Sequence, residues 1–174
     1  RTGRFQDGRK RTFQGSNTPL AALGALILWF GWFGFNGGAN GAMDLRIPLI
    51  LINTFLAASA GLILSSVMGI YVMKKPEPMF MITGPIAGLV SITASCAYVD
   101  PTEAIIIGAI GGIVSGSGIL LLEKIKVDDV VSAVPVHLFA GTWATIAVAI
   151  FGDFEAMGIA VSYTHLRAHE THND

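Results

Sequence analysis

The sequence predicts an all-α integral membrane protein with five transmembrane helices. Its mean hydropathy is +0.62, and only 13% of its 174 residues are charged, whereas soluble domains contain about 25% charged residues. A spanning helix needs roughly 20 mostly apolar residues, and five stretches without Asp, Glu, Lys or Arg meet this requirement. They comprise residues 18–42, 47–73, 79–99, 104–122 and 130–152.

Basic residues are distributed unequally between the two sets of connecting segments. Nine lie before the first span or in the loops after the second and fourth spans, whereas the other set of loops contains only Arg46. Because short loops force neighbouring spans to alternate in direction, this bias predicts a cytoplasmic N-terminal segment and a first span that runs outward. We expect the chain in the cell membrane, in contact with the lipid bilayer and with no nucleic-acid partner.

Glycine recurs at every fourth position in the first, third and fourth spans. Small residues at this spacing let helix backbones approach closely, which predicts tight packing in a multi-helix bundle. A dimerisation motif is the alternative, but its occurrence on several spans favours packing within the bundle. The repeats are Gly34 and Gly38, Gly84 and Gly88, and Gly108, Gly112 and Gly116.

The fifth span contains one ionisable residue, His137, two positions after Pro135. In a helix that begins at residue 130, His137 lies roughly 10–12 Å along the axis, well inside the hydrocarbon. An unpaired imidazole there costs a few kcal/mol, so its ring is expected to face protein or a pore. Pro135 leaves the carbonyl of Val131 without its helical partner and predicts a bend. The pattern favours a pore-lining histidine, with an interhelical hydrogen bond as the structural alternative.

The first span ends in the aromatic sequence WFGWFGFNGG. Trp32 and Phe35 are three residues apart and therefore lie on similar faces of a helix. Aromatic faces attract cations by about 0.5–2 kcal/mol, so these side chains are candidates for the outer part of a cation pathway. An aromatic belt at the membrane interface is the alternative.

Three sequence blocks together resemble the ammonium transporter (Amt/Mep/Rh) family, and the match is closer to its Amt/Mep branch. They are LWFGWFGFNGG, GPIAGLVSITASCAYVDPTEAIIIGAIGGIVSG and VDDVVSAVPVHLFAGTWAT. The resemblance covers about residues 1–151. It implies an eleven-helix fold, built from two inverted five-helix repeats plus a last helix and assembled as a homotrimer. This chain resembles the second repeat.

The resemblance also implies a role for each candidate residue. Phe35 corresponds to a phenylalanine of the outer gate, and Trp32 to a pore-lining tryptophan one turn inward. His137 corresponds to the second of two hydrogen-bonded pore histidines. The implied substrate pathway therefore comprises Trp32, Phe35 and His137, and the implied substrate is ammonium or methylammonium.

Three further residues bear on the resemblance. Asp128 and Asp129 match an acidic pair of the family, and we expect them to have a structural role, because carboxylates stabilise helix N-termini. Ala39 stands where the family often has a serine that contributes to the outer cation site, so that hydrogen bond is expected to be missing.

The expected organisation has four parts. Residues 1–17 are a cytoplasmic loop segment, 18–152 the five-span half of a transporter, 153–161 the start of a truncated further helix, and 162–174 a non-native tail. The tail contains SYTHLRAHET, which resembles a translated sequencing adapter. His165, His169 and His172 have a spacing that would suit a metal site, but this resemblance argues against one. We therefore expect no metal and no other cofactor.

Ammonium transport is the function that the sequence favours, by a partial pore that is expected to be inactive alone. A fragment of another small-substrate channel or secondary transporter is one alternative, and an ammonium sensor is another. A membrane enzyme is disfavoured because His137 has few other polar groups at its depth. The family resemblance also suggests a regulatory protein at the cytoplasmic face.

Overall fold

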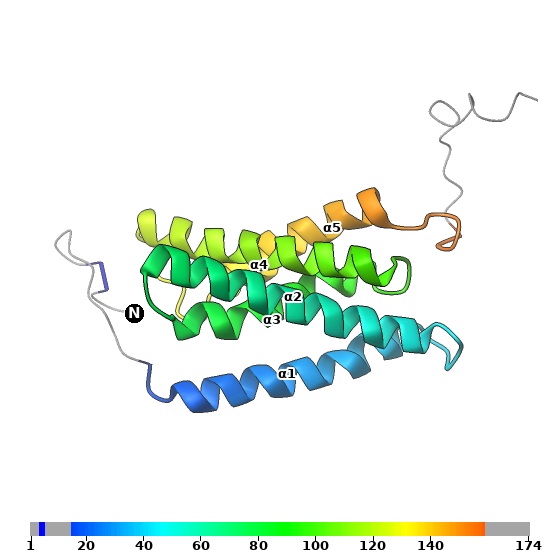
Figure 1. Ribbon diagram of the computed structural model, residues 1–174, viewed down its shortest axis with the longest axis horizontal. Helices are drawn as coiled ribbons and strands as arrows, with labels where there is room; N and C mark the ends of the chain where they lie inside the picture. Colours follow the sequence, from blue (N-terminus) through cyan, green and yellow to red (C-terminus); the bar gives the residue numbers. More distant parts are fainter. Residues whose placement is uncertain (1–3, 6–14, 159–174) are drawn as a thin grey trace, which may run out of the picture.

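All of the described secondary structure is helical in the computed structural model, which describes residues 4–5 and 15–158 (Figure 1). By length and composition, four helices can each cross a membrane, whereas the 16-residue α3 is shorter. The prediction of an all-α membrane protein is therefore confirmed. The elements are α1 (Thr18–Ala39), α2 (Ile47–Met73), α3 (Pro78–Thr93), α4 (Pro101–Lys124) and the π-helix η2 (Val134–Phe139), which continues into α5 (Ala140–Phe151).

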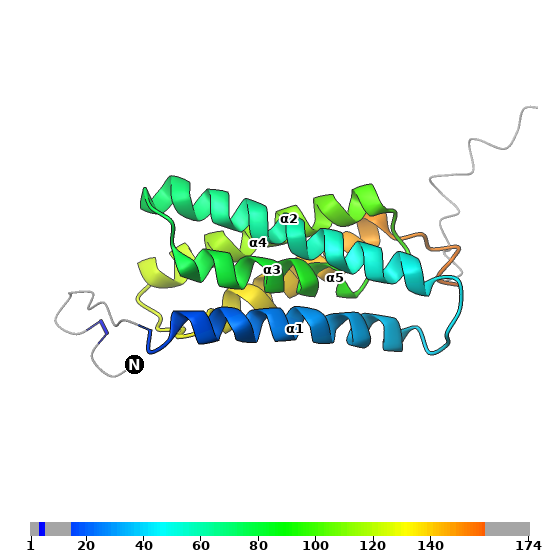
Figure 2. The same cartoon turned by 60° about the horizontal axis from the view of Figure 1, so that its bottom comes forward.

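The helices run side by side along the long axis, and their connections alternate between its two ends (Figures 1 and 2). Residues 40–46 and 94–100 lie at one end, and residues 74–77 and 125–133 at the other. This alternation agrees with the predicted topology. Among the described residues, the basic residue at the first end is Arg46. The basic residues at the second end are Arg4, Lys74, Lys75, Lys124 and Lys126.

Side chains define the N-terminal ends of two helices. The Asn17 side chain accepts a hydrogen bond from the Leu20 backbone N–H at 2.9 Å at the start of α1. Asp100 and Glu103 form a reciprocal capping box at the start of α4. Such caps satisfy backbone N–H groups that have no partner within the helix, and they fix where each span begins.

The third span is shorter than predicted. A continuous helix was expected over residues 79–99, but α3 ends at Thr93 and the chain turns before Asp100. The fully buried Asn53 of α2 donates hydrogen bonds to the carbonyls of Cys96 and Val99, at 2.9 and 2.8 Å. Non-helical backbone at membrane depth requires such internal partners, so Asn53 makes the early end of α3 possible.

The fifth span also begins later than predicted. Ser132 has a positive φ of 55°, and the π-helix η2 begins at Val134. Pro135 therefore lies in the first turn, where a missing N–H costs no helical hydrogen bond. The predicted bend, based on a helix already running through Val131, is wrong. His137 is accordingly in the first turn of its helix rather than the third.

Close helix packing is confirmed for the glycines of α3 and α4. A Cβ atom on Gly88 or Gly108 would overlap the backbone of Ala57 in α2. A Cβ atom on Gly84 or Gly112 would lie 2.8 or 2.6 Å from the carbonyl oxygen of Gly61. Two neighbouring helices therefore contact the same short segment of α2.

The glycines of α1 do not follow this pattern. Within the described part of the chain, a Cβ atom on Gly34 or Gly38 would have no neighbour within 4 Å. No close helix contact is therefore seen at these two positions within the described chain, and the expectation for them stays a prediction. Helix α1 lies at the edge of the bundle (Figure 1), where only 6% of its apolar window is buried.

We predict that Gly88→Ala destabilises the complete protein by about 1–3 kcal/mol, because the added methyl group displaces the α2 backbone. Gly24→Ala in α1 is the matched control, since its Cβ would meet nothing within 4 Å. The control is expected to be neutral or slightly stabilising. Thermal unfolding in detergent measures both, and equal melting temperatures for the two variants would contradict the packing described for α2.

Candidate functional site: the α1 aromatics and the η2 histidine

Trp32 and Phe35 form an edge-to-face pair on α1. Their ring centroids are 6.0 Å apart, with an interplanar angle of 64°, which is a favourable aromatic geometry. Phe35 is 61% exposed, and Trp32 is half-buried. The expectation that these two side chains share a face of the helix is therefore met by their contact.

The Trp32 side chain is also anchored to the last residue of α3. Its indole Nε1–H donates to the Thr93 hydroxyl at 2.8 Å, and that hydroxyl donates to the Leu89 carbonyl at 2.7 Å. This chain of hydrogen bonds fixes the orientation of the indole ring. The sequence reasoning missed Thr93, which is one of three hydroxyl residues in the run SITAS (91–95) and is not distinguished from the other two by spacing.

A second polar contact anchors the same end of α1 to α2. Asn36 is 1% exposed, and its Nδ2–H donates to the Thr54 hydroxyl at 2.9 Å. The Thr54 hydroxyl donates in turn to the Ile50 carbonyl at 2.6 Å. Because Asn36 follows Phe35 directly, this contact fixes the backbone that carries the exposed ring. The sequence reasoning also missed Asn36, whose signal was an amide inside an apolar span.

The other aromatic residues of α1 form a separate group. Trp29 and Phe55 of α2 lie with ring centroids 5.8 Å apart, and they line a shallow apolar groove together with Leu26, Phe30 and Phe33. Thus the two tryptophans of α1 have different surroundings. Of these two tryptophans, Trp32 has a described hydrogen-bond partner for its indole N–H, whereas Trp29 does not.

His137 lies on η2 with its side chain exposed, whereas the adjacent Val136 and Pro135 are buried. Val136 packs in a small cluster with Ala87 of α3 and Ala140 of α5. Helix α3 therefore contacts both the helix that carries His137 and, through Thr93, the ring of Trp32. Among the described residues, no hydrogen bond or ring contact joins His137 to Trp32 or Phe35, so α3 is the element that relates them.

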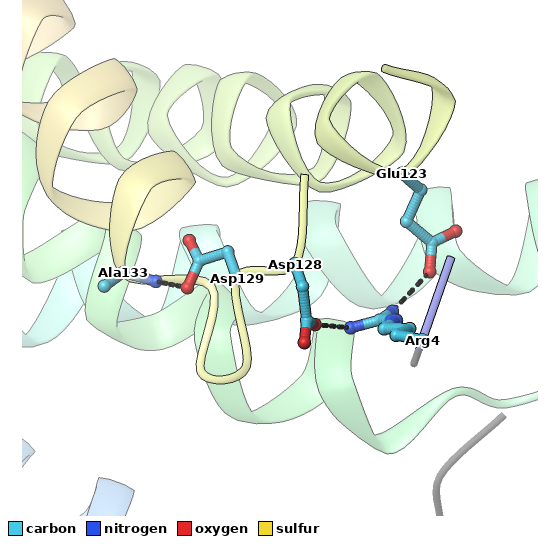
Figure 3. Close-up of polar contacts among 5 residues, drawn as sticks. All are labelled: Arg4, Glu123, Asp128, Asp129 and Ala133. Carbon is cyan, nitrogen blue, oxygen red and sulfur yellow. Dashed lines mark hydrogen bonds and ion pairs between the residues drawn. The ribbon is translucent and has the colours of Figure 1, made fainter. Parts of the chain in front are cut away.

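Asp129 determines where the His137 helix begins. Its carboxylate accepts a hydrogen bond from the backbone N–H of Ala133 at 3.0 Å (Figure 3) and another from the backbone N–H of Val134 at 2.7 Å. A carboxylate at this position also complements the helix dipole. The structural role expected for the acidic pair is therefore observed for Asp129.

The loop that follows α1 contains a second ordered carboxylate. Asp44 accepts hydrogen bonds from the backbone N–H of Arg46 at 2.9 Å and from the Asn40 side chain at 3.1 Å. These hydrogen bonds, first that of Arg46 and then that of Asn40, lower the pKa of Asp44 below its ordinary value. They favour the ionised form, so the connection between α1 and α2 carries a stabilised negative charge.

A sequence model described as the Ammonium Transporter Family matches residues 1–173. The chain belongs to this family. It is 45% identical over 155 residues to ammonium transporter Amt2 of Archaeoglobus fulgidus, a match that covers 88% of this chain and 33% of that relative. It is 41% identical to a putative ammonium transporter of Synechocystis, covering 88% of this chain and 28% of the relative.

Solved structures also support the assignment of this chain to the ammonium transporter family. One described as a Sensor Amt Protein is 39% identical, with a TM-score of 0.82, and the match covers 86% of this chain and 37% of that one. Mep2 of Saccharomyces cerevisiae is 29% identical, with a TM-score of 0.76, covering 84% and 35%. The chain thus spans about a third of the length of the relatives it matches, and it is a multi-pass membrane protein.

We predict that Thr93→Val destabilises the complete protein by about 1–3 kcal/mol, because the part-buried indole N–H of Trp32 loses its acceptor. Trp32→Phe removes the donor, so adding Thr93→Val to it is expected to cost less than Thr93→Val alone. Thermal unfolding of the two single variants and the double variant measures the coupling. Additive costs would show that the hydrogen bond contributes nothing. Thr145→Val, which removes an exposed hydroxyl bonded to its own helix, is the control.

Proposed function

We propose that the complete protein transports ammonium across the cell membrane, through a hydrophobic pore to which this chain contributes Trp32, Phe35 and His137. The observation that carries the proposal is the family match over the length of the chain, whose relatives are described as ammonium transporters. The edge-to-face contact of Trp32 and Phe35 supports it, as does the exposed position of His137. Each of these side chains can meet a solute without displacing the helix core.

The chemistry separates ammonium from potassium by proton loss. A hydrophobic pore excludes a bare cation, at a cost of several kcal/mol, and an aromatic site at its mouth first attracts the cation. Ammonium can then divide into neutral ammonia and a proton, whereas potassium has no proton to give up. Neutral imidazole accepts a proton on one nitrogen and donates one from the other. His137 is our candidate for one half of such a proton relay.

The remaining expectations belong to the same proposal. Residues 18–152 form the second inverted repeat of an eleven-helix transporter, and the complete protein assembles as a homotrimer. The described basic residues at the Lys74 end of the bundle support a cytoplasmic location for that end and for the N-terminal segment. A regulatory protein would bind this same face. Transport, rather than an enzymatic reaction, is the activity that the family supports.

The divisions expected at the C-terminal end stay predictions. Residues 154–158 form turns in the structure, and residues 159–161 of the predicted partial helix lie outside the described residues. The proposed non-native tail, residues 162–174, with its three histidines, also lies outside them.

An ammonium sensor is the second candidate function. The structure described as a Sensor Amt Protein is 39% identical to this chain, with a TM-score of 0.82, so the fold of this region is compatible with sensing. A sensor would bind methylammonium without accumulating it inside the cell. Binding and uptake measured on the same complete protein therefore separate the two functions.

We predict that His137→Ala lowers methylammonium uptake by the complete protein by about tenfold or more, because one proton acceptor of the relay is lost. His137→Asp is expected to alter selectivity, since a fixed negative charge also attracts potassium. Uptake of labelled methylammonium and growth on limiting potassium, in a host without other transporters for either ion, measure these outcomes.

Thr145→Val, on the same span, serves as a control for expression and folding. Uptake and selectivity equal to wild type in both His137 variants would reject the role of this residue. Absence of uptake by the wild-type complete protein, with methylammonium binding retained, would instead support the sensor.

A further inference from the structure

A salt bridge connects the N-terminal segment to the loop that precedes the His137 helix (Figure 3). Arg4 donates through Nη1 to Asp128 at 2.5 Å and through Nη2 to Glu123 at 3.2 Å. The side chains of Arg4, Glu123 and Asp128 are 21%, 29% and 13% exposed. Partial burial weakens solvent screening of the three charges. We call this set of three side chains the Arg4 bridge.

The geometry suits arginine in particular. A guanidinium group presents several donors in a rigid plane, so one side chain can bind two carboxylates at once. Glu123 lies in the last turn of α4, and Asp128 lies in the loop that follows it. Arg4 therefore links the end of one helix to the loop that leads to the next, from a position more than 100 residues away in the sequence.

The loop held by this bridge has a strained backbone. Lys126 and Ser132 both have positive φ angles, of 61° and 55°, although neither is glycine. Residues adopt this sparsely populated region only where the surrounding structure imposes it. A contact from outside the loop helps to maintain its path, and the Arg4 bridge supplies one at Asp128. Its second contact, to Glu123, ties the loop to the end of α4.

The effect of the bridge reaches His137 through adjacent residues. Asp128 precedes Asp129, whose carboxylate binds the N–H groups of Ala133 and Val134 and so sets the start of η2. His137 follows Val134 by three residues, within the same first turn. A shift of Asp128 would move the Asp129 cap, and the cap would move the turn that carries the histidine.

We propose that Arg4 is a positioning residue for His137, which acts through Asp128 and the Asp129 cap. The expected effect of Arg4 on selectivity rests on the proposed transport function. The expected effect of Arg4 on the order of the loop can be tested without measuring transport. A misplacement of about 1 Å in a reacting group can cost as much as a hundredfold in rate, so a loop contact far from the pore can still matter.

The first experiment measures amide hydrogen exchange across residues 125–139 in the complete protein. Arg4→Ala is expected to accelerate exchange at Ala133 and Val134 by about tenfold, because the loop loses its outside contact and opens locally. Lys124→Ala is the matched control, since Lys124 is a basic residue at the same end of α4 with an exposed side chain. Unchanged exchange in Arg4→Ala would overturn the inference, whatever the transport result.

The second experiment measures the ratio of methylammonium uptake to potassium uptake, corrected for protein in the membrane. Arg4→Ala is expected to lower this ratio about tenfold, and Arg4→Lys to restore it only in part, since an ammonium group lacks the planar fork. The double variant Arg4→Asp with Asp128→Arg, which swaps the two charges, is expected to have a higher uptake ratio than either single variant. A folding defect would lower protein abundance and leave the ratio unchanged.

The outcomes separate this inference from the proposed function. Faster exchange at Ala133 and Val134 with an unchanged uptake ratio would overturn the positioning role, because the loop would then loosen without affecting selectivity. Absence of uptake by the wild-type protein would reject the transport proposal, while the exchange experiment would still decide whether the bridge orders the loop.

Discussion

The fold depends on the close approach of α2 to α3 and α4 at the same segment. Carbonyl oxygens at Ala57 and Gly61 face glycines on both neighbours, and a single added methyl group at these glycines would overlap the α2 backbone. Within a bilayer, helix association gains little from the hydrophobic effect, because lipid tails are as apolar as leucine. Contact between backbones therefore provides much of the attraction. The three helices form a compact centre, against which α1 and the η2–α5 helix are arranged (Figures 1 and 2).

Polar residues on α2 extend this centre toward the candidate site. Neighbouring residues Asn53 and Thr54 are both fully buried and act in different directions. Asn53 binds the turn after α3, and Thr54 binds Asn36 on α1. Because α3 ends early, its last residue, Thr93, is available to bind the Trp32 indole. One short segment of α2 therefore supports both the end of α3 and the aromatic end of α1, so the position of the aromatic pair follows from how the bundle packs.

Hydropathy, glycine spacing and loop charge were enough to predict the class, the approximate spans and the alternating connections, because these depend on periodic or summed properties of the chain. They could not predict the end of α3 at Thr93, since residues 94–99 continue the uncharged sequence of the helix before them. The turn there is stabilised by partners distant in the sequence, the Asn53 side chain and the Asp153 backbone N–H. The predicted bend at Pro135 failed for a related reason. A proline suits the first turn of a helix or disturbs its interior, and the Asp129 cap decides which. Glycine spacing also does not specify which helix face meets a neighbour, and within the described chain nothing lies within 4 Å of a Cβ atom at Gly34.

The polar side chains that hold the described helices together differ from His137 in their surroundings. Asn36, Asn53 and Thr54 are buried, and each makes a hydrogen bond to another helix or loop of the chain, where an unpaired donor would cost several kcal/mol. His137 is exposed and takes no part in the packing that fixes its helix; buried Pro135 and Val136 and the Asp129 cap fulfil that task. Within the described part of the chain, the start of the His137 helix is therefore fixed by backbone hydrogen bonds to Asp129 and by apolar contacts, and not by the imidazole ring.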